Sequence, residues 1–442
     1  MTATISQLRR KPMAGSASGR LRKSTTFDRA LVVLGFLSLV GLYARLFDVS
    51  NYHVTIGGLC AASTLILALR RMTFRIMPLM LALIALIVPV AIYAVSSALR
   101  VTILPPSSQF AASYALWVVS VLLLATAFLT RSALPTNAAF AANVVIVSIC
   151  AFQIIAAGIF HKLIGFELVK PITGVGLGES YVHVSASLAA RAIGLVYEPS
   201  MCGRIIGTLC FIDLIRTQKV FRNMVLAVLG MLLTKSLGLL VLIVVIGTIL
   251  FARSLRQFLI LSIGLGIVVV VMGTTISQRI ETAATAGSAS SVDRRTMAPL
   301  TTVKYAISNY PLGIPIGANE TISRKTGYFA LTGESHITNG IYEFIMYFGV
   351  FGIAACLMLI FYSGILFIRG ERELSAAIMY LFLSTALSGS FLSIESSLLT
   401  FLFITTCLAV RRYRKQFELR SRAMVRRPTA KPRRLSCPAV YS

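Results

Sequence analysis

Long apolar runs separated by short polar breaks dominate the pattern of this 442-residue chain. A transmembrane helix needs about 20 mostly apolar residues, and the chain can be threaded as twelve such runs. They lie at 30–47, 54–69, 76–97, 110–130, 138–160, 197–215, 223–235, 237–252, 257–276, 338–366, 374–389 and 391–410. The pattern predicts an all-α polytopic membrane protein with about 12 transmembrane helices.

Lysine and arginine clusters fall in alternate connections between these runs. If the N-terminus is cytoplasmic, the basic clusters at 70–75, 216–222, 252–256 and 369–373 all lie on that same side, with the C-terminal tail. Positive residues are enriched in the cytoplasmic loops of membrane proteins. The distribution therefore predicts that both termini are cytoplasmic.

Charge divides the chain into three parts. Basic tails at 1–29 and 411–442, with net charges of +6 and +10, flank a transmembrane domain at 30–410. Two long segments at about 161–196 and about 277–337 are predicted on the outer side, with net charges of only +1 and +2. Basic tails beside spans are drawn to anionic membrane lipids. No finger spacing or aromatic-interleaved module supports a nucleic-acid partner.

The stretch 223–252 would form one long apolar helix but for the break at Thr234-Lys235-Ser236. Two short helices that meet at Lys235 keep the basic loops on one side, whereas a single helix would reverse every later loop. The sequence therefore predicts a hairpin with Lys235 at its outer end.

A first candidate cluster lies in RAIGLVYEPSMCGR, which holds Arg191, Glu198 and Arg204. Ionisable groups at membrane depth are costly and usually face an interior cavity. Glu198 precedes Pro199, so it is either a helix cap or a site carboxylate held by one of the arginines. Ion pairing between helices is the structural alternative for both arginines.

A second candidate is the pair Arg294 and Arg295, followed by an amphipathic turn or two and a Pro/Gly-rich bend at 311–317. Guanidinium groups bind phosphate through fixed, often bidentate donors. A solvated surface pair is the alternative.

A third candidate is the trio His336, Asn339 and Glu343 at the start of the tenth run. These positions share one face if the helix extends back to 336. Histidine exchanges protons near neutral pH, although a lone histidine at a helix start also serves as a cap or interface group.

Other chemistry has no signal in the sequence. There is no Walker A, HExxH or GxSxG motif, and the seven cysteines show no metal-ligand spacing. We expect no metal, no cofactor and no disulfide framework.

Taken in order, these motifs resemble the bacterial polysaccharide polymerase and O-antigen ligase superfamily. The matching residues are Arg191, Gly194, Leu195, Glu198, Pro199, Ser200 and Gly203, then Thr234-Lys235-Ser236, then Arg294 or Arg295 with Pro311, Gly313 and Gly317, and last His336, Asn339, Gly349 and Gly352. His336 and Asn339 are separated by two residues rather than adjacent. The Glu-Pro-Ser triplet is similar to that of exopolysaccharide or capsule polymerases of the Wzy type, so a polymerase is the leading interpretation.

The resemblance implies a GT-C-like glycosyltransferase in the bacterial inner membrane, with its active site facing the periplasm. It also implies metal-independent, inverting polymerisation of undecaprenyl-pyrophosphate-linked repeat units into exopolysaccharide, capsule or O-antigen. A flippase and a chain-length regulator are candidate partner proteins. His336 or Glu198 would be the catalytic base. The residues expected to bind substrate or pyrophosphate are Arg191, Arg204, Lys235, Arg294, Arg295, Asn339 and Glu343.

Two other functions remain open from the sequence. A ligase would share the donor and transfer the glycan to lipid A or another acceptor. A transporter of polysaccharide or lipid-linked oligosaccharide should carry ionisable or broken-helix positions near mid-membrane on several spans. Here the ionisable groups gather at one face, which favours an enzyme.

Overall fold

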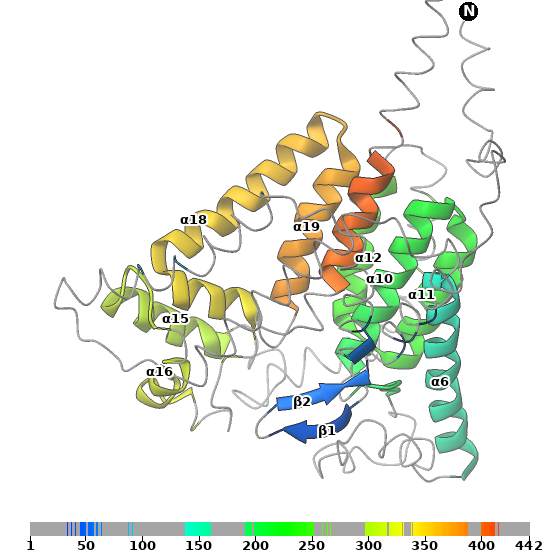
Figure 1. Cartoon of the computed structure of the whole chain (residues 1–442), viewed down its shortest axis with the longest axis horizontal. Helices are drawn as coiled ribbons and strands as arrows, with labels where there is room; N and C mark the ends of the chain where they lie inside the picture. Colours follow the sequence, from blue (N-terminus) through cyan, green and yellow to red (C-terminus); the bar gives the residue numbers. More distant parts are fainter. Residues whose placement is uncertain are drawn as a thin grey trace, which may run out of the picture.

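The computed structural model describes residues 138–160, 191–196, 199–251, 297–315, 318–328, 339–387 and 399–411, a hairpin at 45–49 and 52–55, and isolated positions between them. These ranges are almost entirely helical (Figure 1). The labelled helices are α6 (Ala138–Phe160), α10 (Pro199–Thr217), α11 (Val220–Thr234), α12 (Leu237–Phe251), α15 (Met297–Asn309), α16 (Asn319–Lys325), α18 (Gly340–Ile368) and α19 (Arg372–Ala386). A final helix without a label spans Leu399–Arg411.

The predicted helices from residue 138 onward agree with those observed wherever the structure describes them. The run at 138–160 is α6, and the break at Lys235 separates α11 from α12. The runs at 197–215, 338–366 and 374–389 correspond to α10, α18 and α19, displaced by two or three residues at each end. The predicted run at 110–130 lies outside the described residues, and those before it and at 257–276 are described at few positions.

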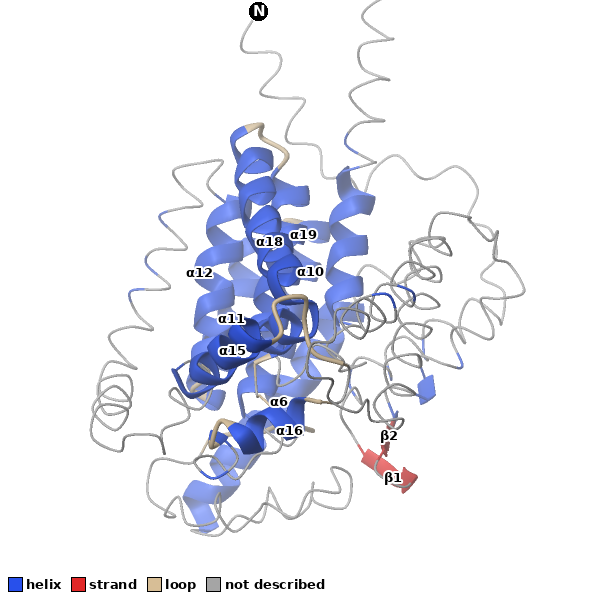
Figure 2. Cartoon of the chain, turned by 90° about the vertical axis from the view of Figure 1, so that its left-hand side faces the viewer, coloured by secondary structure: helices blue, strands red, loops and turns tan. Residues whose placement is uncertain are grey.

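A two-stranded antiparallel hairpin replaces helix where the first two predicted runs meet. Strand β1 (Arg45–Val49) pairs with β2 (Tyr52–Thr55), and Val49 lies opposite Tyr52. The expectation of an all-α chain was therefore wrong here. Both strands are rich in β-branched and aromatic residues and are joined by two residues, the pattern of a short hairpin. The hairpin is the red element of Figure 2.

Helix α10 is the centre of a bundle formed with α6, α11, α12, α19 and the final helix (Figures 1 and 2). Every residue of α10 from Met201 to Ile215 is buried. Two glycines let α12 approach closely: a Cβ on Gly203 would lie 2.6 Å from Ser236 Oγ, and one on Gly207 would lie 2.6 Å from Leu239 Cδ1. Small residues four apart are a common basis for tight helix packing in membranes.

A second apolar cluster joins α15, α16 and the first part of α18. Helix α18 breaks at Gly349, which has φ 54° and ψ −134°. Val350 N–H donates to Pro311 O (2.9 Å), and Ile314 N–H donates to Met346 O (2.9 Å). The turn after α15 therefore supplies the hydrogen bonds that the break removes from α18, as a buried polar backbone requires.

Two of the described helices, α6 and α18, are long and apolar enough to cross a membrane. The second part of α18 exposes large apolar side chains, including Phe351 (60%), Met358 (68%) and Phe361 (71%). Exposed apolar area of this size marks an interaction or membrane surface. Helices α11 and α12 and the final helix are shorter apolar helices.

Candidate functional site

The turn between α11 and α12 brings two predicted cations together. Lys235 ends α11 in the left-handed conformation (φ 47°), and its N–H donates to Met231 O at 2.7 Å. Arg191 donates from Nε to Thr234 O (3.1 Å) and from Nη2 to Lys235 O (3.4 Å). Positive side chains at a helix C-terminus interact favourably with the last carbonyls and the helix dipole. Arg191 and Lys235 thus meet at one end of the bundle although they are 44 residues apart.

The backbone that follows Arg191 is buried although it is not helical. Ala192 N–H donates to Leu233 O (2.9 Å), and Val196 N–H donates to Ile193 O (3.2 Å). Gly194 has φ +62°, and a Cβ there would lie 2.8 Å from Cys202 Sγ. The space and the backbone conformation therefore both require glycine at this position of the motif.

Arg204, on α10, is only 1% exposed. Its Nη1 donates to the carbonyl of Ser384 on α19 at 3.1 Å. Thr208 Oγ1 donates to Arg204 O at 2.7 Å and also hydrogen-bonds the Tyr380 hydroxyl. Ser384 Oγ in turn bonds Thr400 of the final helix at 2.8 Å. A cation in an apolar bundle is costly, and here α10, α19 and the final helix surround it with polar groups.

Arg204 follows Gly203, which packs against Ser236 of the same turn, while the Arg204 guanidinium itself bonds Ser384 on α19. We define the cation cluster as Arg191, Arg204 and Lys235. Lys235 and Arg191 are half-buried, and Arg204 is buried. Guanidinium and ammonium donors suit a phosphate or pyrophosphate group.

Asn339 is the N-cap of α18. Its Oδ1 accepts hydrogen bonds from the N–H groups of Ile341 (3.0 Å) and Tyr342 (3.4 Å), and its backbone is extended. The helix begins at Gly340 and does not extend back to 336. The condition under which His336, Asn339 and Glu343 would share one helical face is therefore not met, because the cap ends the helix before it reaches the histidine.

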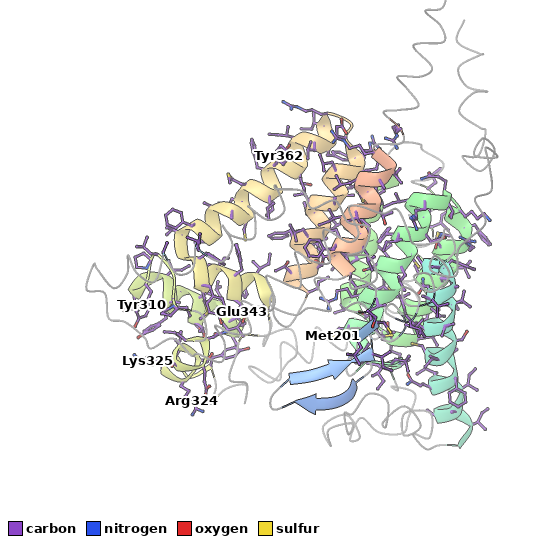
Figure 3. The ribbon with its side chains drawn as sticks, in the orientation of Figure 1. Met201, Tyr310, Arg324, Lys325, Glu343 and Tyr362 are labelled. Carbon is purple, nitrogen blue, oxygen red and sulfur yellow. The ribbon has the colours of Figure 1, made fainter. Side chains whose placement is uncertain are left out.

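Glu343 lies in the first turn of α18 and is 2% exposed. A carboxylate is favoured at this end of a helix by the dipole. Figure 3 shows Glu343 and Met201 at about the same level, while Tyr362 lies near the opposite end. The start of α18 and the start of α10 therefore lie toward the same end of the molecule.

Four predicted site residues lie outside the described residues. They are Glu198, Arg294, Arg295 and His336. Arg295 comes two residues before α15, and His336 comes one residue before Ile337, which is fully buried in the second apolar cluster.

The opposite end of the bundle carries charges that pair with one another. Asp213 on α10 accepts from Arg222, and from Asn223 Nδ2 at 2.6 Å, and Arg222 lies 3.8 Å from the centre of the Phe140 ring. These contacts join the α10–α11 turn to the start of α6.

The α18–α19 turn pairs in the same way with the end of the chain's final helix. Arg411 donates to Glu371 at 2.7 Å, and Arg414 pairs with Glu373. Donation of this hydrogen bond to Glu371 raises the pKa of the Arg411 guanidinium. We predicted the 216–222 and 369–373 segments on the cytoplasmic side. Each of them contacts the end of a neighbouring helix: the first contacts the start of α6, and the second contacts the end of the 399–411 helix.

Sequence reasoning missed the neutral polar residues around the cluster. Thr208 and Ser384 hydrogen-bond Arg204, and Tyr380 hydrogen-bonds Thr208. Gln153 on α6 bonds the backbone at 193–194. These residues could have been found as amides or hydroxyls in otherwise apolar runs, since such polar groups need a hydrogen-bond partner in the membrane. Our sequence reasoning weighed ionisable residues and cysteines instead.

Within the described ranges, no three His, Cys, Asp or Glu side chains come together as ligands for a metal ion. The cation cluster consists of donors only, so its chemistry is suited to an anion.

Residues 30–412 match the protein family described as WcaD colanic acid polymerase. Searches of curated proteins and of solved structures found no match. The family and the apolar helices together indicate a membrane protein with a glycosyltransferase-type activity.

Proposed function

Because this chain belongs to the WcaD colanic acid polymerase family, we propose that it polymerises undecaprenyl-pyrophosphate-linked oligosaccharides into an exopolysaccharide at the periplasmic face of the inner membrane. Membership of the family implies polymerisation of repeat units and a lipid-linked oligosaccharide substrate. The carrier, the side of the membrane and the inverting mechanism are parts of the proposal.

The cation cluster is the observation that carries this proposal. Arg191 donates to the carbonyls of the α11–α12 turn, which includes Lys235, and the buried Arg204 follows the glycine that packs against this turn. A polymerase must stabilise the negative charge of a departing lipid pyrophosphate, and preorganised donors in a water-poor site do this efficiently. A need for such donors would explain cations in an apolar bundle.

The reaction that we propose is a direct displacement. A hydroxyl of the acceptor repeat unit attacks the anomeric carbon of the donor glycan, and a new C–O bond forms on the opposite face. The bond from that carbon to the pyrophosphate oxygen breaks, and undecaprenyl pyrophosphate leaves with the electron pair. The hydroxyl proton passes to a general base, either His336 or Glu198. Arg191, Arg204 and Lys235, together with Arg294 and Arg295, hold the pyrophosphate, while Asn339 and Glu343 contact the saccharide.

Reporter fusions test the proposed arrangement in the membrane. Alkaline phosphatase fused after 180 or 310 should be active, and a fusion after 219 should be inactive, because the first two positions belong to the long outer segments. The reverse pattern would overturn the proposed orientation of the cluster.

Glycan profiling of a deletion strain tests the reaction. Loss of long chains with accumulation of single lipid-linked repeats supports a polymerase. Polymer that stays on the undecaprenyl carrier would instead identify a ligase.

Complementation of that strain tests the cluster. Arg191→Ala should restore normal protein levels without long polymer, whereas Arg324→Ala, a change at an exposed surface pair, should restore polymer. Normal polymer from Arg191→Ala would remove Arg191 from the pyrophosphate site.

A further inference from the structure

Gln153 is a fully buried amide on the apolar helix α6, and it contacts the segment that carries Arg191. Its Oε1 accepts hydrogen bonds from the N–H groups of Ile193 (3.1 Å) and Gly194 (2.9 Å). Its Nε2 donates to Gly194 O at 3.0 Å. One side chain therefore satisfies three backbone groups of a buried turn.

This turn needs such a partner because its own hydrogen bonds are few. Buried backbone that is neither helix nor sheet must find side-chain or backbone partners, and in a membrane no water replaces them. On one side, Arg191 and Ala192 bond the end of α11. On the other side, Gln153 holds Ile193 and Gly194. The segment is thus fixed between α11 and α6.

Asn143 on the same helix shows that a buried amide there can do something different. It is also fully buried, but its Nδ2 donates to Ile206 O (3.3 Å) and Cys210 Sγ (2.9 Å) on α10. Asn143 joins one helix to another, and these hydrogen bonds go to α10 rather than to the 191–196 segment. It is therefore a matched control for Gln153.

We propose that Gln153 is a positioning residue of the pyrophosphate site, and this proposal rests on the proposed function. By fixing residues 193–194, it holds the backbone from which Arg191 reaches the carbonyls of Thr234 and Lys235. Arg191 then stays bound to the α11–α12 turn in the absence of substrate. Such preorganisation lowers the cost of ordering the cations around an anion. Gln153 itself contacts no substrate.

Hydrogen exchange of the purified full-length chain tests the positioning directly. In Gln153→Leu, the amides of Ile193 and Gly194 lose their acceptor, so the peptide that contains them should exchange about tenfold faster or more. The same peptide in Asn143→Leu should exchange as in the wild type. Gln153→Glu keeps an accepting oxygen and loses the amide donor, so its exchange should lie between the two.

Binding of undecaprenyl pyrophosphate tests the consequence for the site. We would measure its apparent affinity from the thermal stabilisation of the detergent-purified protein. Gln153→Leu should weaken binding by about tenfold, the effect of losing one or two hydrogen bonds. Asn143→Leu should bind as the wild type does even if it melts at a lower temperature, which separates positioning from general stability.

The outcomes distinguish this proposal from the proposed function. If the wild type binds the lipid and Gln153→Leu binds it equally well, the positioning role is overturned. It is also overturned if Asn143→Leu accelerates exchange at 193–194 as much as Gln153→Leu does. If the wild type does not bind the lipid, the proposed pyrophosphate site itself fails. Faster exchange confined to Gln153→Leu together with weaker binding supports both.

Discussion

Two apolar helices of this protein, α10 and α18, have opposite surroundings. Helix α10 is buried on every side from Met201 to Ile215, whereas only 28% of the most apolar stretch of α18 is buried. Helix α10 contains Arg204, Thr208 and Asp213, and each has protein partners. After Glu343, α18 contains no charged residue. Protein on all sides allows a helix to carry charge in a membrane, whereas a helix that faces lipid must remain apolar.

The two ends of α10 also differ in how their charged residues are arranged. Near its start, Arg204 belongs to the cation cluster, and its guanidinium donates to the carbonyl of Ser384. Near its end, Asp213 pairs with Arg222 and Asn223. Paired charges satisfy one another and hold helices together. The pairs at the second end therefore stabilise the bundle, whereas the guanidinium and ammonium donors at the first end suit an anion, which is the basis of the proposed site.

The largest expected effect concerns the break in α18. Gly349→Ala should destabilise the protein by about 3 kcal/mol or more, because an alanine at this φ and ψ is strained and its Cβ would collide with Pro311 O. Gly364→Ala, on the same helix but with open space around it, should be neutral or stabilising by about 0.5–1 kcal/mol. Thermal unfolding in detergent measures both. Equal melting temperatures for the two variants would contradict the strained conformation of Gly349 in α18.

The second effect concerns the charge inside α10. Arg204→Leu should reduce the yield of long polymer by about 100-fold, the usual effect of removing one donor that stabilises a developing negative charge. Replacing a buried charge with an apolar side chain is often neutral for stability, so folded protein should persist. Polymer per folded protein in the complemented deletion strain is the measurement. Near-normal polymer would exclude Arg204 from the site.

The third effect concerns the opposite end of α10. Asp213→Ala removes the acceptor of Arg222 and Asn223, and it should destabilise the protein by about 2 kcal/mol. Polymer made per folded protein should stay normal, because this end is not in the proposed site. A specific loss of long chains without loss of stability would contradict the division between the two ends.

The smallest effect concerns the surface of α16. Arg324 pairs with Glu320 one helical turn away, and its side chain is 58% exposed. Arg324→Ala should change the free energy of unfolding by less than about 0.5 kcal/mol and leave polymer unchanged. Arg324→Ala therefore gives the effect of removing an exposed arginine, with which the effects of substituting Arg191 and Arg204 are compared. A strong loss of polymer here would extend the site to α16.

Several local features were readable from single stretches of sequence. The apolar run at 138–160 predicted α6, and the polar break at Lys235 predicted two helices in place of one. These predictions held because helix formation and its interruption depend on neighbouring residues. The hairpin at 45–55 was missed, since its apolar strands continue the apolar runs on either side.

The candidate site was predictable only in part. Its cations were visible as unusual residues in an apolar chain, but their grouping was not. Arg191 meets Lys235 because α10 and α11 fold back beside it, and Arg204 meets Ser384, which is 180 residues away.

The sequence by itself determined where the long apolar helices lie, where α11 ends, and which charges would need a reason to be in the membrane. Only the tertiary structure decided that Gln153 holds the Arg191 segment, that the turn at 311–314 completes α18 at Gly349, and that Asn339 caps the helix instead of extending it. The physical reason is that hydrogen-bond partners within a few residues are fixed by local sequence. Partners that satisfy a buried backbone group across helices depend on how the whole chain packs.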